Sequence, residues 1–166
     1  GKLPDEAADR LRGSGYEVAY FIHNSGAYGN QVFSGQITMS FDLMLDPEQP
    51  GRLNLYMRGS SGEFGLLSVA DGKIRLNGTD VASIRPGTWQ QVVLAFEAGD
   101  VASPLIQVTV RSQDGKETAA TVPSATPTLK DVGMLGFSAA GDGTGIMCLD
   151  NVTVARVKDG KSETPI

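Results

Sequence analysis

The sequence has very few of the residues that build disulfides and zinc sites. Its 166 residues include one cysteine, Cys148, and one histidine, His23. A lone cysteine excludes an internal disulfide, and a cysteine between Met147 and Leu149 is typical of a small buried apolar position. One cysteine and one histidine are also too few for a zinc site with the usual number and spacing of ligands. A single cysteine is compatible with a protein of the cytoplasm and equally with one of an oxidising compartment.

A basic surface is missing as well. Nineteen acidic residues against fourteen basic ones give a net charge of -5, and no Lys and Arg cluster could neutralise several phosphates. The longest apolar runs, such as VVLAF at 92–96, are far too short to cross a bilayer. We therefore expect no nucleic-acid partner and no membrane insertion. The polar start KLPDEAADR after Gly1 has no apolar signal core, so any signal peptide would have been removed upstream.

Helical patterning is nearly absent, whereas glycine is abundant. Only residues 3–11 place apolar side chains at spacings of three and four, which predicts at most a short N-terminal helical segment. Twenty-one glycines indicate many turns. From residue 16 onward the apolar residues alternate with polar ones, with period two. The sequence predicts an all-β fold.

Two segments show this alternation most clearly. In residues 32–45, Phe33, Ile37, Met39, Phe41, Leu43 and Leu45 share one parity, and Gln36, Thr38, Ser40 and Asp42 share the other. In residues 52–58, Leu53, Leu55 and Met57 alternate with Arg52, Asn54, Tyr56 and Arg58. Each segment predicts a strand with one buried and one solvated face.

Further short strands follow at regular spacing, and Asp71-Gly72 and Asp114-Gly115 are strong hairpin signals. No second helical layer and no domain boundary is evident. We predict a single domain over residues 1–166, built as a two-sheet antiparallel β-sandwich.

Four segments carry a family resemblance. DGKIRLNG, PGTWQQVVLAFEA, IQVTVRSQDGK and the ending GIMCLDNVTVARV resemble, in this order, the strands of concanavalin A-like and laminin G-like jelly-roll domains. The resemblance covers residues 32–157. It implies a jelly roll from a group that includes carbohydrate-binding modules, lectins, adhesion domains, and glycan hydrolases and lyases, among them keto-glycoside hydrolase-like domains. Fold alone does not choose among these functions.

Catalytic motifs of this fold are not evident. The Glu-x-Asp-x-x-Glu pattern of its retaining glycosidases is absent, and the acidic pairs Asp46 with Glu48 and Asp114 with Glu117 lie in predicted turns. Its lyases use Tyr and His with Arg and Gln or Asn, and His23 is the one histidine. No serine sits in a nucleophile elbow. We identify no catalytic residues.

Two sets of residues are candidates for a glycan site. Arg52, Asn54, Tyr56 and Arg58 combine an aromatic face with planar polar groups on the solvated side of one strand. The loop HNSGAYGNQ offers His23, Asn24, Tyr28 and Asn30 beside glycines that admit close backbone approach. The alternatives are an ordinary exposed face and a plain turn-rich loop. We assign Trp89 and the phenylalanines 41, 64, 96 and 137 to the core.

Besides a glycan, the sequence suggests one other candidate for binding, a structural calcium ion. Asp142 in GDGTG and Asp150 in LDNV are its candidate ligands, and no other cofactor is expected. Asp150 shares parity with Cys148 and Val152, which predicts that it points toward the edge of the core. Backbone donors are the alternative partners for a carboxylate there.

The sequence therefore predicts a non-catalytic carbohydrate-binding or surface-interaction module that takes an oligo- or polysaccharide, secreted, periplasmic or on a cell surface. A glycan hydrolase or lyase of the same fold is the first alternative. A structural or adhesion domain with a protein partner is the second.

Overall fold

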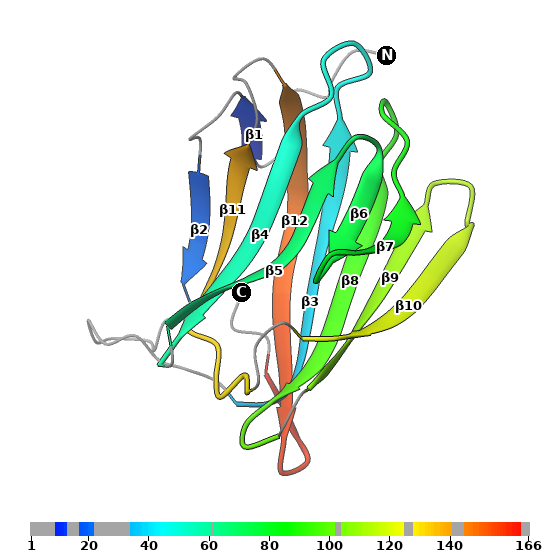
Figure 1. Cartoon of the computed structure of the whole chain (residues 1–166). Coiled ribbons are helices and arrows are strands. Elements are labelled where there is room, and N and C mark those ends of the chain that lie inside the picture. The colour runs from blue at the N-terminus through cyan, green and yellow to red at the C-terminus, as the bar shows by residue number, and fades with distance from the viewer. Residues whose placement is uncertain are drawn as a thin grey trace.

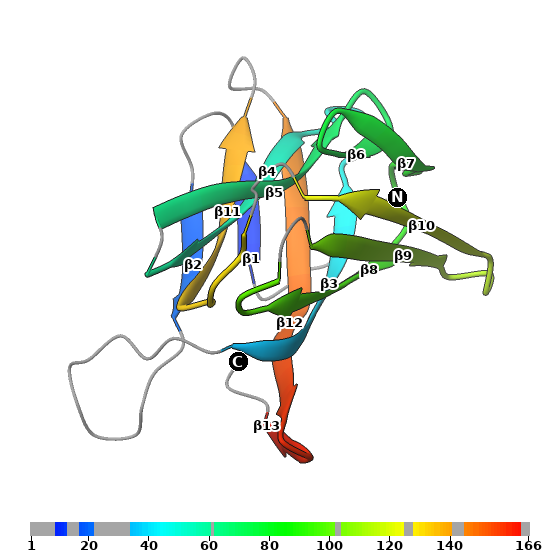
Figure 2. The ribbon, with the colours of Figure 1, turned by 60° about the horizontal axis from the view of Figure 1, so that its bottom comes forward.

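The structure is a computed structural model that describes residues 9–12, 17–21, 34–60, 62–101, 104–124, 128–140 and 145–163. For residues 9–12, 17–21 and 163 it describes the backbone alone. The described residues form two antiparallel sheets, which lie face to face in Figure 1 and Figure 2. The all-β sandwich predicted from the alternation is confirmed.

Sheet A has the order β1-β12-β3-β8-β9-β10, with β13 paired to β12. Its strands are β1 (Asp9–Arg12), β3 (Gly35–Leu45), β8 (Gln90–Ala98), β9 (Leu105–Ser112), β10 (Glu117–Pro123), β12 (Ile146–Lys158) and β13 (Lys161–Glu163). Sheet B has the order β2-β11-β4-β5-β6-β7. Its strands are β2 (Glu17–Phe21), β4 (Arg52–Gly59), β5 (Gly62–Ala70), β6 (Lys73–Leu76), β7 (Thr79–Ser83) and β11 (Met134–Ala140).

The core lies between the sheets, where the predicted apolar parities meet. On β3 the positions Ile37, Met39, Phe41, Leu43 and Leu45 are all at most 1% exposed, whereas Gln36 and Thr38 between them are exposed. Phe41 of sheet A packs edge to face on Phe137 of sheet B, with ring centroids 5.0 Å apart. On β3, alternation in the sequence thus tells the inner face from the outer one.

Trp89 is an exception to the predicted core. It is half-buried, precedes β8 and lies outside the apolar cluster, whereas the three phenylalanines at 41, 96 and 137 belong to it and Phe64 packs against its edge. The reason is that β8 begins one residue later, at Gln90, and Gln90 takes the first inward position with 5% exposure.

Of residues 3–11, where the sequence allowed at most a short helical segment, residues 3–8 lie outside the described residues. No helix occurs in the part of the chain that the structure describes, and residues 9–11 of the predicted segment belong to β1. This strand pairs with β12, where Arg10 lies opposite Cys148. Ladder hydrogen bonds with β12 outweigh a weak local preference for helix. No helix among the described residues is long and apolar enough to span a membrane.

Tight turns join several neighbouring strands. Asp71-Gly72, Asn77-Gly78 and Asp159-Gly160 each have two successive positive φ angles, as a type I′ hairpin requires. The hairpin predicted at Asp71-Gly72 is therefore confirmed. These turns fix the registers of β5 with β6, β6 with β7 and β12 with β13.

Candidate functional site

Five polar residues line up across the outer face of sheet A, which is the face turned away from the core. Each is the Cα partner of the next across neighbouring strands. In strand order from β12 through β3, β8 and β9 to β10, this polar row is Asp150, Asp42, Gln91, Arg111 and Glu117. Cross-strand partners on one face lie about 4.5–5.5 Å apart, so the row is a continuous band of hydrogen-bonding groups.

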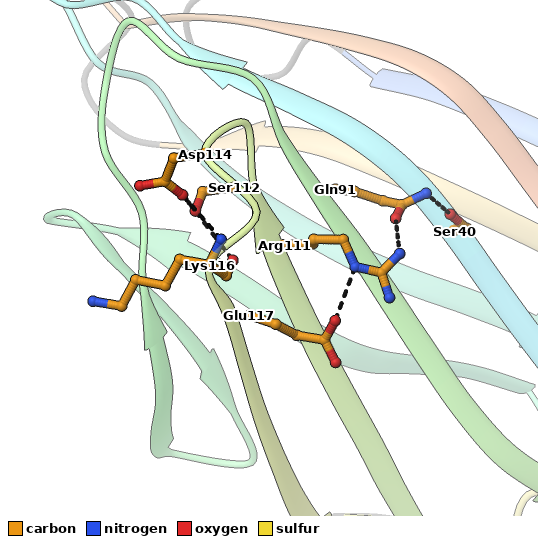
Figure 3. A network of polar contacts seen from close by, with 7 residues as sticks. All are labelled: Ser40, Gln91, Arg111, Ser112, Asp114, Lys116 and Glu117. Carbon is orange, nitrogen blue, oxygen red and sulfur yellow. Dashed lines mark hydrogen bonds and ion pairs between the residues drawn. The ribbon is translucent and has the colours of Figure 1, made fainter.

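Hydrogen bonds hold the centre of the polar row together (Figure 3). Arg111 Nε donates to Glu117 Oε2 at 2.9 Å, and Arg111 Nη1 donates to Gln91 Oε1 at 3.3 Å. Gln91 Nε2 in turn donates to Ser40 Oγ at 3.4 Å. The guanidinium and the amide are thereby oriented before any ligand arrives, which lowers the entropic cost of binding.

A β-bulge shapes the β12 end of the polar row. The register shifts between Asp150 and Thr153, and Asn151 takes a left-handed conformation with φ of 49°. The Asn151 backbone N–H donates to Asp150 Oδ1 at 2.8 Å, and its side-chain Nδ2 donates to Asp42 Oδ2 at 2.7 Å. The bulge thus ties both carboxylates of this end to one asparagine.

The bulge also corrects the predicted direction of Asp150. Asp150 pairs with Asp42 on the outer face, whereas Val152, two residues later, packs against the core. Simple alternation would have given Asp150 and Val152 the same side, but the extra residue of the bulge moves them to opposite sides. Asp150 therefore faces solvent rather than the edge of the core.

The calcium hypothesis rests on two aspartates, of which one is described. Asp142 lies outside the described residues. Within the described ranges no three His, Cys, Asp or Glu side chains gather closely enough to hold a metal ion. Asp150 has a hydrogen-bond donor in Asn151, which is the kind of backbone partner that the sequence offered as the alternative. The metal assignment stays a prediction.

A groove occupies the other end of the outer face of sheet A. Its volume is about 540 Å³. Polar side chains from four strands line it, namely Gln36, Glu97, Gln107 and Thr121, together with the apolar Val101, Pro104 and Leu105. Leu105 is 59% exposed, which is unusual for a leucine in a strand of this protein. The groove and the polar row are separated by short side chains such as Val93, Thr109 and Ala119.

The outer face of sheet A is acidic. Outward-facing side chains of its five central strands include four carboxylates, Asp42, Asp150, Glu97 and Glu117, and one guanidinium, Arg111. At the edge, the backbone of β1 pairs with β12, with Arg10 opposite Cys148 and Arg12 opposite Ile146. The described side chains of the face therefore carry a net negative charge at neutral pH.

The predicted row on β4 lies on the opposite side of the molecule, on the outer face of sheet B. Arg52, Asn54 and Arg58 are exposed and Tyr56 is half-buried, while Leu53, Leu55 and Met57 are at most 1% exposed. The predicted parity is confirmed. Whether this row binds a glycan stays a prediction.

Partners on neighbouring strands engage this row. Arg52 Nη2 lies 3.2 Å from Asp71 Oδ1, and Arg58 Nη2 lies 2.8 Å from Glu63 Oε2. The ring of Tyr56 covers Gly136 of β11, since a Cβ at Gly136 would overlap the ring. The two guanidinium groups and the ring thus each contact another residue of sheet B or its turns.

The remaining predicted ligands, His23, Asn24, Tyr28 and Asn30, lie outside the described residues. Gln91 and Arg111 were not predicted as site residues. The alternating segments VVLAF and IQVTV predict that the adjacent Gln91 and Arg111 face outward. Their alignment with Asp42, however, depends on strand pairings between distant segments.

Comparisons with known proteins rest on structure alone. No family model matches the sequence, and no curated protein matches it. The marine PL-14 alginate lyase from Aplysia kurodai superposes with a TM-score of 0.56 at 12% identity, over 85% of this chain and 82% of that one. The endo-beta-1,4-glucuronan lyase from the fungus Trichoderma reesei gives a TM-score of 0.50 at 12% identity, over 91% and 96%. A Lotus tetragonolobus seed lectin gives 0.48 at 11% identity, over 89% and 79%. With its two face-to-face antiparallel sheets, the chain has the concanavalin A-like jelly-roll fold.

Proposed function

We propose that the chain binds a polysaccharide on the outer face of sheet A, as a non-catalytic module. The observation that carries the proposal is the polar row, because its amide, guanidinium and carboxylate groups are aligned across five strands and oriented by their own hydrogen bonds. Polysaccharides are met mainly outside the cell, so we also propose a secreted, periplasmic or cell-surface location.

The chemistry of the row suits sugar hydroxyls. A guanidinium donates two parallel N–H bonds, an amide has a carbonyl acceptor beside its N–H donors, and carboxylates accept on two oxygens, so each can engage neighbouring hydroxyls in pairs. Gln91 is half-buried and Arg111 is exposed, which leaves both within reach of a ligand. Such groups on a shallow sheet face favour binding over a broad surface.

The groove extends this surface along the strands. On β3, Asp42 belongs to the polar row and Gln36 lines the groove. These two residues are six positions apart, which corresponds to about 20 Å at the usual strand rise. The exposed side chain of Leu105 can contact the C–H face of a sugar ring. A site of this length fits an extended chain better than a single sugar.

Charge favours a neutral polymer. Among the described side chains of this face, four carboxylates against one guanidinium repel a polyanion at low salt, because like charges across an interface disfavour association. Alginate and glucuronan, the substrates named for the two lyases, are polymers of uronic acids. We therefore propose a neutral polysaccharide, which distinguishes this chain from those two neighbours in fold.

Affinity gel electrophoresis tests the proposal. The chain is run in native gels that contain a β-glucan, a xylan, a galactomannan, alginate or glucuronan, and each polymer is also incubated with the chain in solution. We expect at least one neutral polymer to retard the chain, and no reducing ends or unsaturated uronate products to appear.

Other results would overturn the proposal in different ways. New reducing ends or unsaturated products would make the chain a glycan hydrolase or lyase. Retardation by alginate or glucuronan alone would contradict the neutral ligand. No retardation by any polymer would favour a structural or adhesion role with a protein partner.

A further inference from the structure

A second cavity opens where the two sheets part, between β7 of sheet B and the β9–β10 hairpin of sheet A. β7 and β10 lie on the same side of the molecule in Figure 1 and Figure 2 and contact each other. The volume of this edge cleft is about 680 Å³, within the range of about 300–1,000 Å³ that small-molecule sites occupy. Its floor is apolar, because the buried residues Val81, Ile84 and Val110 line it.

A buried amide also lines the edge cleft. Gln90 is 5% exposed and is the one buried polar side chain among the described residues. Its Oε1 accepts a hydrogen bond from the Arg85 backbone N–H at 3.1 Å. The edge cleft therefore has a side-chain amide beside its apolar floor.

The rim of the edge cleft carries two basic residues that form no ion pair within 4.0 Å among the described residues, although the charges of both act on Asp114. Asp80 is paired with Lys73 and Arg75, and Asp114 accepts hydrogen bonds from Ser112 Oγ and the Lys116 backbone N–H. Among the described residues neither Arg85 nor the Lys116 ammonium forms an ion pair within 4.0 Å, although both line the edge cleft. In Figure 3 the side chain of Lys116 extends in the opposite direction from Arg111 of the polar row.

This rim differs from the rest of the molecule in charge. The chain as a whole has a net charge of -5. On the rim, Lys73, Arg85 and Lys116 outnumber Asp80 and Asp114. A carboxylate that entered the edge cleft would meet an arginine fork and an ammonium, both suited to it.

We propose that the edge cleft binds a carboxylate-bearing saccharide of one or two rings. Arg85 and Lys116 hold the carboxylate, Gln90 Nε2 donates to a ring or hydroxyl oxygen, and the apolar floor contacts the C–H face of the sugar. The edge cleft lies between the sheets, whereas the polar row lies on the outer face of sheet A, so this site is separate from the proposed polysaccharide surface.

Isothermal titration calorimetry on the full chain tests the inference with three probes. They are digalacturonate, the neutral disaccharide cellobiose, and sodium sulfate. We expect digalacturonate to bind at least about tenfold more tightly than either other probe, which corresponds to one charge-assisted hydrogen bond. Arg85→Gln and Lys116→Gln are each expected to weaken digalacturonate binding about tenfold.

The matched control is Lys161→Gln, which removes an exposed cation on β13 that belongs to neither proposed site. It is expected to leave digalacturonate binding unchanged. Both rim residues have exposed side chains, so their variants are expected to fold.

Three results would overturn the inference: no heat of binding with digalacturonate, equal affinity for sulfate, or unchanged affinity in both rim variants. Equal affinity for sulfate would reduce the edge cleft to a simple anion site. Retardation of the chain by neutral polysaccharides is independent of these measurements, so the polysaccharide proposal and this one can fail separately.

Discussion

The ring of Tyr56 on β4 lies over Gly136 on β11, its cross-strand partner, and fills the space that a side chain at 136 would need. An aromatic ring over a strand glycine shields the backbone and adds apolar contact. We predict that Gly136→Ala destabilises the fold by about 1–3 kcal/mol, because the added methyl group displaces the ring. Urea unfolding of the variant measures the change.

Gly65 provides the control for that prediction. It lies opposite Tyr56 on the other side, on β5, and a Cβ there would meet nothing within 4 Å. Gly65→Ala is expected to be neutral or to stabilise by about 0.4–1 kcal/mol. In a Tyr56→Ala background the cost of Gly136→Ala should largely disappear. An unchanged cost there would mean that the backbone, rather than the ring, resists the methyl group.

The bulge at Asn151 gives a second prediction. Its φ of 49° is tolerated by glycine and asparagine but strained for a β-branched residue. Asn151→Gly is expected to cost less than Asn151→Val, which should lose about 1–3 kcal/mol. Thermal unfolding of the two variants gives the comparison. If both lose the same stability, the hydrogen bond from Asn151 Nδ2 to Asp42, and not the backbone, dominates.

Asp150→Ala tests the other half of the bulge. Asp150 Oδ1 accepts the Asn151 backbone N–H at 2.8 Å, and the residue is half-buried. Losing this acceptor should cost about 1–3 kcal/mol, and the melting temperature should fall. An unchanged melting temperature would show that water replaces the carboxylate without loss. A fall in the melting temperature of the wild type on chelation would instead support calcium.

Much of the fold could be predicted from the sequence, because period-two alternation is a local signal. The inner and outer faces of β3 and β4 follow from consecutive side chains alone. The hairpin at Asp71-Gly72 follows from two residues. Strand β1 could not be predicted in this way, because its pairing with β12 depends on residues more than a hundred positions away.

The candidate site was less predictable for the same physical reason. Outward positions on β3 and β8 can be recognised one strand at a time, but the alignment of Asp42 with Gln91 depends on register. Asp150 shows the second limit, since one extra residue in a bulge reverses the face of everything beyond it. A row such as Arg52 to Arg58 lies within a single strand and therefore stands out in the sequence, whatever its function.

Acid should weaken the β9–β10 hairpin through Asp114. The hydrogen bond from Ser112, followed by that from the Lys116 backbone, lowers the pKa of Asp114 below its usual 3.8. A carboxyl with a lowered pKa stabilises the fold above its unfolded pKa, and this contribution is lost as pH falls through the folded pKa. The stability difference between wild type and Asp114→Asn should thus be constant above about pH 5 and shrink below 3.8.

The control for Asp114 is Ser112→Ala, which removes the largest cause of the shift. In this variant the pKa of Asp114, followed by NMR of its carboxyl carbon, should rise toward 3.8. Arg75 and then Lys73 lower the pKa of Asp80 in the same way, so Asp80→Asn should show the same pH window. A stability difference that grows on acidification would contradict the assignment for either residue.

Variants of two arginines on opposite faces of the molecule distinguish between the two candidate glycan surfaces. Arg111 pairs with Glu117 on the outer face of sheet A at 2.9 Å, and Arg52 pairs with Asp71 on the outer face of sheet B at 3.2 Å. Both pairs are about half exposed or more, so each contributes at most about 1 kcal/mol to stability. Arg111→Gln and Gln91→Ala are expected to weaken polysaccharide binding about tenfold, while Arg52→Gln leaves it unchanged.

The reverse pattern would place the ligand on the other face. If Arg52→Gln and Tyr56→Ala weaken retardation in the affinity gel and Arg111→Gln does not, the row on β4 binds the polysaccharide. Because Arg52 and Arg111 have the same charge and similar exposed ion pairs, a general effect of charge would move both variants equally. Equal loss in both variants would therefore point to the change in net charge and to neither face, and would contradict binding of a neutral polymer by the polar row.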